Sequence, residues 1–349
     1  MFAKKLLIGF SLFSVVSAMA AEYQGYTILE AAPDSKSLPT VLVPPYKLYP
    51  IQLTLGQAMV REIIKDRFGV KIFSDLKYKW DDNKDLEANL RSLKSNELQV
   101  YVEEMQTRMN KASYGGGFTP TGVFLFGGYH RCRAAYEVNQ TLAKLSSNPK
   151  IRIFVPIKLE INYSSAGLTE NDIAKDIFIT RAQGFVTDRE AGIKAGMNLQ
   201  DAAVLKFQYL TKKAPHLGAL VDNPYRSLIG GAMYDNEIQT ETFVPHVEYY
   251  LEDLFKDKID KAVGGKGVYP GMTIGNDLIN RVKKVIFSDK ATLEKVGYWA
   301  RFGNLSKEQA YERCLMLEKK DDKTQTAQEN SDEKICKSNR EKLLKHLIK

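Results

Sequence analysis

Residues 121–136 read TGVFLFGGYHRCRAAY and form the stretch that decides the fold. The apolar segment at 123–126 predicts a short β-strand, and the pattern after it predicts a helix from about residue 129 to 145. Gly127 and Gly128 stand between them and permit backbone angles that other residues resist. The first turn of the helix presents unpaired N–H groups and the positive end of the helix dipole. This junction is therefore expected to bind an anion such as phosphate.

Side chains at the start of this helix add hydrogen-bond donors to the expected phosphate site. They belong to His130, Arg131 and Arg133, and arginine can hold phosphate through two parallel hydrogen bonds. Arg131 shares a stripe with apolar residues four, seven and eleven positions further on, so it stands at the N-terminal end of the buried face. A partly buried arginine needs an anionic partner. That partner is either a bound phosphate or a carboxylate of the chain, such as Glu62 or Glu137.

The segments around this unit predict an α+β fold in which a mixed sheet is followed by a mainly helical part. Strands are expected at 40–43 and 151–157, whereas the glycine-rich residues 114–117 are expected to form a flexible loop. Helices are expected at about 56–68, 85–110, 169–179, 199–209, 225–234 and 244–262. Asp222 is favoured as the N-cap of a helix that starts near Pro224.

Residues 263–349 are expected to be a helical extension to a domain that spans residues 21–262. A stretch rich in glycine, 263–271, separates the two. Residues 319–334 are polar and poor in apolar side chains, which predicts a solvated linker. Residues 335–349 are basic and predict a helix, either a solvated surface helix or one that contacts nucleic acid or a membrane.

The N-terminus predicts an exported protein, periplasmic or secreted. Lys4 and Lys5 precede an apolar run at 6–16, and residues 18–20 have the small–x–small pattern of a signal-peptide cleavage site. The run is shorter than the roughly 20 residues that a membrane-spanning helix needs. No later stretch is apolar enough to span a membrane. An uncleaved N-terminal anchor is the alternative to a signal peptide occupying residues 1–20.

Charge and cysteine content narrow the class of partner and of site. The chain has 50 Lys and Arg against 42 Asp and Glu, a net charge of +8, which is compatible with an anionic partner but does not establish one. Export allows disulfides, and Cys314 and Cys336 are the expected pair, leaving Cys132 free. No two cysteines have the spacing of zinc ligands and the four histidines are scattered, so no dedicated structural zinc site is expected. His216 and His246 stand alone in the sequence and are not expected to be catalytic.

The motif at the strand–helix junction resembles the phosphate-binding box of a known superfamily. Residues 128–135, GYHRCRAA, resemble the Gly-x-x-Arg-x-Arg-Ala-Ala box of ParB partition proteins, which binds nucleotide phosphates. Residues 126–131, FGGYHR, are similar to the Phe-Gly-Gly-Cys-His-Arg motif of sulfiredoxins, and the two families share one fold. The resemblance implies a ParB/sulfiredoxin-like domain. It implies phosphate or nucleotide binding by Gly127, Gly128, Tyr129, Arg131 and Arg133.

Two further segments resemble the ParB-like nucleases and occur in the same order. Residues 49–60, with YPIQ followed by Gly56 and Val60, resemble that group's Arg-Pro-Thr-Gln…Gly…Val opening. Residues 222–228, DNPYRSL, resemble its Asp-Asp-Pro-Tyr-Arg-Ser-Leu segment, and an aromatic–acidic helix at 243–254 follows. The resemblance covers residues 40–256. It implies that Tyr225 and Arg226 reach the phosphate and that His130 is the candidate acid–base catalyst of phosphodiester hydrolysis. The cofactor stays open, with a divalent metal and a nucleotide as the candidates.

The departures from these families keep other functions open. The nucleases have Asp-Gly-His-His where this chain has GGYH at 127–130, so the alternative is a non-catalytic protein that binds a nucleotide or nucleic acid. The sulfiredoxin cysteine is replaced by Tyr129, and Cys132 would point elsewhere on the helix. An ATP-dependent phosphotransferase and a structural or interaction protein are the remaining interpretations.

Overall fold

The computed structural model describes residues 21–164, 167–180, 191–194, 197–234, 247–264, 267–299 and 307–347. The expected signal peptide at residues 1–20 lies outside the described residues. In the part of the chain that is described, no helix is long and apolar enough to cross a membrane.

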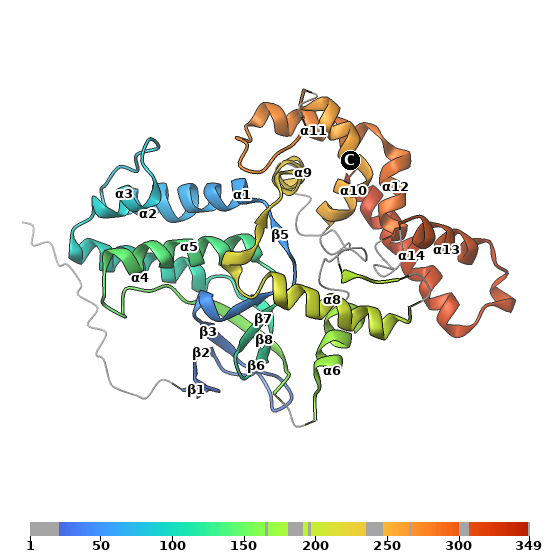
Figure 1. Ribbon diagram of the computed structural model, residues 1–349, viewed down its shortest axis with the longest axis horizontal. Coiled ribbons are helices and arrows are strands. Elements are labelled where there is room, and N and C mark those ends of the chain that lie inside the picture. The colour runs from blue at the N-terminus through green and yellow to red at the C-terminus, as the bar shows by residue number, and fades with distance from the viewer. Residues whose placement is uncertain are drawn as a thin grey trace, which may run out of the picture.

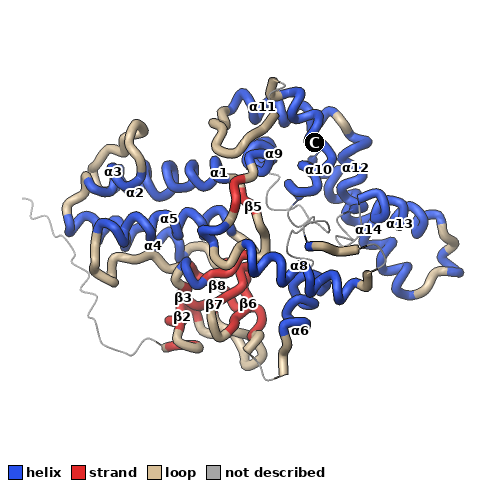
Figure 2. Tube along the Cα trace, in the orientation of Figure 1, coloured by secondary structure: helices blue, strands red, loops and turns tan. Residues whose placement is uncertain are grey.

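A seven-stranded mixed sheet lies below helices α4 (Ser95–Asn110) and α5 (Tyr129–Leu145) in Figures 1 and 2. The strand order is β1-β2-β3-β8-β6-β7-β4, in which β8 runs parallel to β6 and β7 parallel to β4, while the other neighbours are antiparallel. The expected strand at 40–43 is confirmed, and the one expected at 151–157 begins only at Val155. The strands are β1 (Glu22–Tyr23), β2 (Tyr26–Glu30), β3 (Thr40–Val43), β4 (Leu48–Pro50), β6 (Tyr114–Thr119), β7 (Gly122–Leu125) and β8 (Val155–Asn162).

The glycine-rich residues 114–117 begin the interior strand β6, so the prediction of a flexible loop was wrong. Neighbouring side chains fill the space that Cβ atoms would need. A Cβ on Gly116 would lie 2.6 Å from Cγ2 of Ile157, and one on Gly117 would lie 2.3 Å from the Tyr163 ring. Glycine in a strand commonly marks such close packing. The neighbours come from β8 and the turn after it, so the local sequence did not reveal them.

A continuous helical segment covers the other side of α5 and forms the upper layer in Figure 1. It consists of α1 (Gln57–Glu62), the π-helix η2 (Ile63–Val70) and α2 (Lys71–Asp75). The single helix expected at 85–110 is interrupted and forms α3 (Leu86–Arg91) and α4. Asp85 accepts a hydrogen bond from Ala88 N–H at the start of α3, which is an N-cap.

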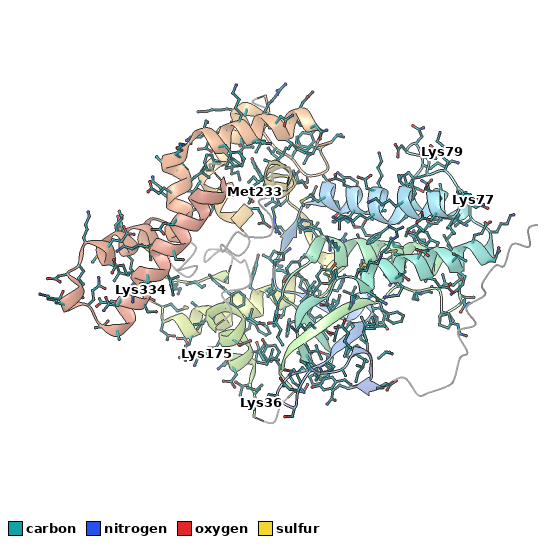
Figure 3. The ribbon with its side chains drawn as sticks, turned by 180° about the vertical axis from the view of Figure 1, so that it is seen from behind. Lys36, Lys77, Lys79, Lys175, Met233 and Lys334 are labelled. Atoms are coloured by element: carbon teal, nitrogen blue, oxygen red, sulfur yellow. A yellow bond between two sulfur atoms is a disulfide. The ribbon has the colours of Figure 1, made fainter. Side chains whose placement is uncertain are left out.

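The remainder of the described chain is mainly helical, as expected. A second hydrophobic cluster joins helices α9 to α12, and Met233 lies within it (Figure 3). This cluster crosses residue 263, where the sequence places the end of the first domain. A two-stranded parallel sheet of β5 (Thr54–Leu55) and β9 (Val221–Asp222) connects the start of α1 with the start of α9. The helices are α6 (Glu170–Lys175), α8 (Leu199–Lys213), α9 (Pro224–Tyr234), α10 (Val247–Ala262), α11 (Asn276–Ser288), α12 (Lys290–Trp299), α13 (Lys307–Lys319) and α14 (Ala327–Leu347), with a π-helix η3 (Asp176–Thr180) after α6.

A disulfide between Cys314 and Cys336 joins α13 to α14, as the sequence predicted. The solvated linker expected at 319–334 is wrong in its second half, because α14 begins at Ala327. Asp332 and Glu333 of that half are buried. The polar composition therefore gave no sign that one face of this helix is packed.

The close packing of β6 generates a stability prediction. Gly116→Ala is expected to lower the free energy of unfolding by about 1–3 kcal/mol, because overpacking a filled site costs that much. The added methyl would also lie 3.0 Å from the carbonyl oxygen of Phe124. Chemical denaturation measures the change. Gly127→Ala is the control, since no atom lies within 4 Å of its Cβ position, and equal destabilisation by both substitutions would contradict the prediction.

Candidate functional site

The turn before α5 depends on a glycine in a left-handed conformation. Gly128 has φ +73° and ψ 19° and is the N-cap of α5, and a residue without a Cβ adopts these angles at no steric cost. Its absent Cβ would lie 2.2 Å from the ring of Tyr114. The ring of this β6 residue therefore packs directly against the start of the helix. Gly127 has open space around it, so Gly128 is the glycine that the backbone requires.

The buried face of α5 matches the predicted apolar stripe. Ala135, Val138 and Leu142 are fully buried, and so is Cys132. Tyr129, expected to bind phosphate, is also buried, and its hydroxyl donates a hydrogen bond to the carbonyl of Leu125. Its ring lines the candidate cavity, whereas its hydroxyl forms a hydrogen bond that stabilises the fold.

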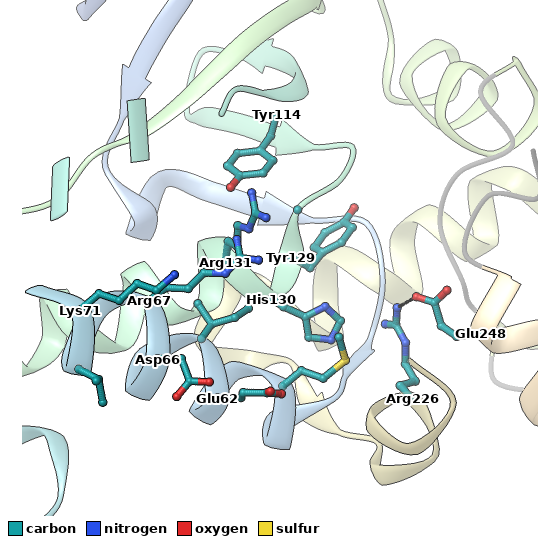
Figure 4. A pocket seen from close by; sticks show the side chains of 14 residues that line it. Glu62, Asp66, Arg67, Lys71, Tyr114, Tyr129, His130, Arg131, Arg226 and Glu248 are labelled. Carbon is teal, nitrogen blue, oxygen red and sulfur yellow. Dashed lines mark hydrogen bonds and ion pairs between the residues drawn. The ribbon is translucent and has the colours of Figure 1, made fainter. Parts of the chain in front are cut away.

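A cavity of about 770 Å³, here called the main cavity, lies between the first turn of α5 and the α1–η2–α2 segment (Figure 4). Gly128, Tyr129, His130 and Arg131, all expected site residues, line it. Several charged side chains from other elements join them. These are Glu62, Asp66, Arg67, Lys71, Arg226 and Glu248.

Arg131 lines the main cavity with its guanidinium beside the Tyr114 hydroxyl (Figure 4). No carboxylate of a described residue forms an ion pair with it. Glu137, one of the two acids considered from the sequence, instead accepts hydrogen bonds from Arg133 Nε and Gln57 Nε2, each at 2.7 Å. Glu62 faces the same cavity without pairing to a described cation. The chain therefore leaves the charge of Arg131 available to a ligand.

The π-helix η2 supplies the cations that sequence reasoning missed. Hydrogen bonds in a π-helix join residues five apart, and such segments occur frequently at functional sites. Glu62 and Arg67 are five residues apart, as are Asp66 and Lys71, and all four line the main cavity. The sequence predicted a helix there but gave no sign of its π-helical form. The charged stripe at 62, 66, 67 and 71 was the available signal.

The tyrosine and the cysteine nearest Arg131 remain protonated. Burial raises the pKa of the Tyr114 hydroxyl, as does Cys132 to a smaller extent, while Arg131 and Arg67 act in the opposite direction. Burial also raises the pKa of the Cys132 thiol, against a smaller opposing effect of Arg131. Tyr114 can therefore donate a hydrogen bond, whereas Cys132 is an inert core residue.

His130 holds the start of α1 through one of its ring nitrogens. The Gly56 N–H donates a hydrogen bond to His130 Nε2 at 3.1 Å, so that nitrogen carries no proton. An acid–base role, as implied by the nuclease resemblance, would have to use Nδ1.

Arg133 does not line the main cavity, contrary to its expected phosphate-binding role. Its Nε pairs with Glu137, and its Nη1 donates to the carbonyl of Leu217 at 2.6 Å. This arginine ties α5 to the short helix η4 (Leu217–Ala219). Its charge is balanced within the protein.

Arg226 lines the main cavity, whereas Tyr225, also expected to reach the phosphate, does not. Arg226 is 2% exposed and lines the main cavity, where its Nη2 contacts Glu248 Oε1 at 2.5 Å and its Nη1 donates to the Thr54 carbonyl at 2.7 Å (Figure 4). Tyr225 lies in the second hydrophobic cluster and donates its hydroxyl to Asp260 at 2.6 Å. The structure therefore brings only Arg226 to the cavity.

The cap of α9 is Asn223 rather than Asp222, so that prediction was wrong by one residue. Asn223 Oδ1 accepts from the Tyr225 N–H at 3.0 Å. Asp222 instead accepts from the Gln57 and Gly271 N–H groups, both at 2.9 Å, and so satisfies the first turn of α1 from a distance.

Of the two histidines expected to play no catalytic part, His216 is described by the structure and does not line the main cavity. His216 stacks on the ring of Tyr136 with a centroid distance of 6.1 Å, and His246 lies outside the described residues. Across the described segments, no three His, Cys, Asp or Glu side chains are grouped so that they could hold a metal ion.

Comparison with known proteins yields one structural similarity. No protein-family model matches the chain, and no curated protein matches it. The chain is similar to the crystal structure of protein Atu1540 from Agrobacterium tumefaciens, with a TM-score of 0.39 and 14% identity, over 72% of this chain and 92% of that chain. The ParB/sulfiredoxin resemblance rests on the sequence motifs and stays a prediction.

Thiol counting tests the assignment of the three cysteines. The native protein is expected to show no thiol that reacts rapidly near neutral pH, because Cys132 is buried and Cys314 and Cys336 are paired. Unfolding without reductant should expose one thiol, and unfolding with reductant all three. A reactive thiol in the native protein would show that Cys132 is accessible, and three thiols without reductant would disprove the disulfide.

Proposed function

We propose that the protein binds a phosphate-bearing ligand of nucleotide size, either a nucleotide or part of a nucleic acid, in the main cavity. The observation that carries this proposal is the guanidinium of Arg131, which lines the cavity without a carboxylate partner from the described residues. A partly buried charge that lacks a partner is costly. Phosphate would provide the partner through the paired hydrogen bonds that guanidinium groups form with it.

The surroundings of Arg131 support an anion. The first turn of α5 offers backbone N–H groups and the positive end of the dipole beside Gly128. Arg67 and Lys71 add two positive charges from the opposite wall. The site has a volume of about 770 Å³, which falls within the roughly 300–1,000 Å³ of small-molecule sites.

The carboxylates of the cavity favour a ligand that carries hydrogen-bond donors in addition to its phosphate. Glu62 and Asp66 line the same cavity as the cations. Carboxylates accept hydrogen bonds, so they suit the hydroxyl or amino groups that a nucleotide carries beyond its phosphate. A ligand that is anionic along its whole length would meet repulsion at these two residues.

Phosphodiester hydrolysis is the second candidate function. It is favoured by the placement of Glu62 and Asp66 in one cavity with Arg67, Lys71 and Arg131, since a carboxylate can act as general base while cations stabilise developing charge. Oxygen ligands of this kind, together with ligand phosphates, also suit a divalent metal such as magnesium.

We further propose that the protein acts outside the cytoplasm. The signal-like residues 1–20 motivate this assignment, and the Cys314–Cys336 disulfide supports it, because disulfides persist in oxidising compartments.

Nucleotide binding is expected to depend on Arg131. Arg131→Gln should weaken the affinity for adenosine 5′-monophosphate at least tenfold, because a hydrogen bond to a charged group contributes about 1.5–3 kcal/mol. Isothermal titration calorimetry measures the affinity, and added salt should weaken it. Lys144→Gln, on the exposed end of the same helix, is the matched control. Equal affinity of wild type and Arg131→Gln would contradict the proposal.

Plasmid nicking separates the second candidate from binding alone. If Glu62 or Asp66 is the general base, Glu62→Gln or Asp66→Asn should abolish nicking in the presence of magnesium while leaving nucleotide binding measurable. Wild-type protein that binds nucleotide and leaves the plasmid intact would remove hydrolysis and retain binding.

A further inference from the structure

We propose that a small recess beside the main cavity is a subsite for a terminal phosphate group, so that the ligand is a phosphomonoester rather than an internal phosphodiester. This inference rests on the proposed function. The recess has a volume of about 240 Å³ and shares Arg67, Lys71, Tyr114 and Arg131 with the main cavity. These four side chains form the boundary between the two spaces, and Figure 4 shows them on one side of the site.

The charge of the recess differs from that of the main cavity. Its charged lining consists of four cations, Arg67, Lys71, Arg108 and Arg131, and no carboxylate of a described residue lines it. Arg108 is balanced by Asp75, since its Nη2 lies 2.6 Å from the carboxylate. The other three cations form no ion pair with any residue that the structure describes. The positive charge thus gathers in the recess.

Two polar groups on the lining residues of the recess have hydrogen-bonding capacity left within the described part of the chain. Nε of Arg108 is buried and has no hydrogen-bond partner in the described part of the chain. A buried donor without an acceptor is unfavourable, and the side chain that carries this donor lines the recess. Burial is the main influence on the pKa of the Tyr114 hydroxyl and raises it. The hydroxyl therefore stays protonated and adds a further donor.

The number of charges favours a dianion. A phosphomonoester carries about −1.5 to −2 charges near pH 7 and offers three acceptor oxygens. An internal phosphodiester carries one charge and offers two unesterified oxygens. Three cations without ion-pair partners, on three different elements, match the phosphomonoester more closely.

The recess is small and is closed on one side by core residues, which suits the terminal group of a ligand. Phe68 and Met109 line it and are 3% and 2% exposed, so the core closes this side. Its 240 Å³ is below the roughly 300–1,000 Å³ of sites that hold whole small molecules. The recess is therefore large enough for a phosphate group and smaller than sites that hold a whole small molecule. The remainder of the ligand then extends into the main cavity, toward Glu62 and Asp66.

The test compares adenosine 5′-monophosphate with its phosphate methyl ester by calorimetry at pH 5 and pH 7. The monophosphate should bind at least tenfold more tightly than the ester at pH 7. Its affinity should fall about tenfold at pH 5, because the second phosphate pKa is about 6 and the dianion is then a minor species. The ester has a single charge at both values and should change little.

The methyl ester is the control for pH effects that arise from the protein and not from the phosphate group. The groups that face the recess are Arg67 and Lys71 from the helical segment, Arg108 with Asp75, Tyr114 and Arg131. Arginine, lysine and tyrosine side chains do not titrate between pH 5 and pH 7. Glu62, Asp66 and His130 line the main cavity, which both ligands would occupy, so any pH-dependent change there would alter the binding of the ester as well.

Variants of the helical segment locate the phosphate. Arg67→Gln and Lys71→Gln should each weaken the monophosphate at least fivefold and the ester less. Lys65→Gln is the matched control, because Lys65 belongs to the same segment, pairs with Asp82 and lines neither space. Thermal melting shows whether each variant is folded.

Oligothymidylates with and without a 5′-phosphate identify the source of the phosphomonoester. Binding of only the phosphorylated strand indicates a nucleic-acid end, whereas binding of the free nucleotide alone indicates a small metabolite, and both support a terminal phosphate subsite. The inference is overturned if the methyl ester binds as tightly as the monophosphate, or the unphosphorylated strand as tightly as the phosphorylated one. If none of these compounds binds, the proposed function fails as well.

Discussion

The site depends on one steric constraint, the contact between Gly128 and the ring of Tyr114. No side chain fits at position 128, and the backbone there is left-handed. This contact fixes where α5 begins and therefore where Arg131 projects. The glycines of β6 extend the same close packing into the interior of the sheet. The helix N-terminus and its arginine are thus held by packed elements, so a ligand meets them already in place.

The arginines around this constraint divide by how their charges are balanced. Arg133 and Arg226 are bound to carboxylates and backbone carbonyls, and they fasten helices to one another. Arg67 and Arg131 face open space without an ion pair to a described residue. Since an unbalanced charge is unfavourable in a partly buried place, this second pair carries the functional argument. All four residues are arginines, so the sequence alone does not show which pair is balanced within the protein and which pair faces the cavity.

The start of α1 connects the cavity to the helical half of the protein. His130 accepts the Gly56 N–H, Asp222 accepts the Gln57 N–H, and Arg226 holds the Thr54 carbonyl. Each contact comes from a different segment and satisfies a backbone group of residues 54–57. Because helix starts leave N–H groups without partners, these contacts stabilise the wall of the cavity. They also explain why Asp222 serves α1 and leaves the cap of α9 to Asn223.

The sequence by itself determined the strand–helix junction at 123–145, the apolar stripe of α5, the Cys314–Cys336 pair and the mixed α+β class. Such features follow from local periodicity and from glycine and cysteine chemistry, which act over few residues. Only the tertiary structure decided that residues 114–117 begin an interior strand, that η2 is π-helical and places Arg67 and Lys71 opposite Arg131, and that Arg133 is neutralised. These outcomes depend on contacts between segments far apart in the chain, and no local pattern specifies which side chains will meet there.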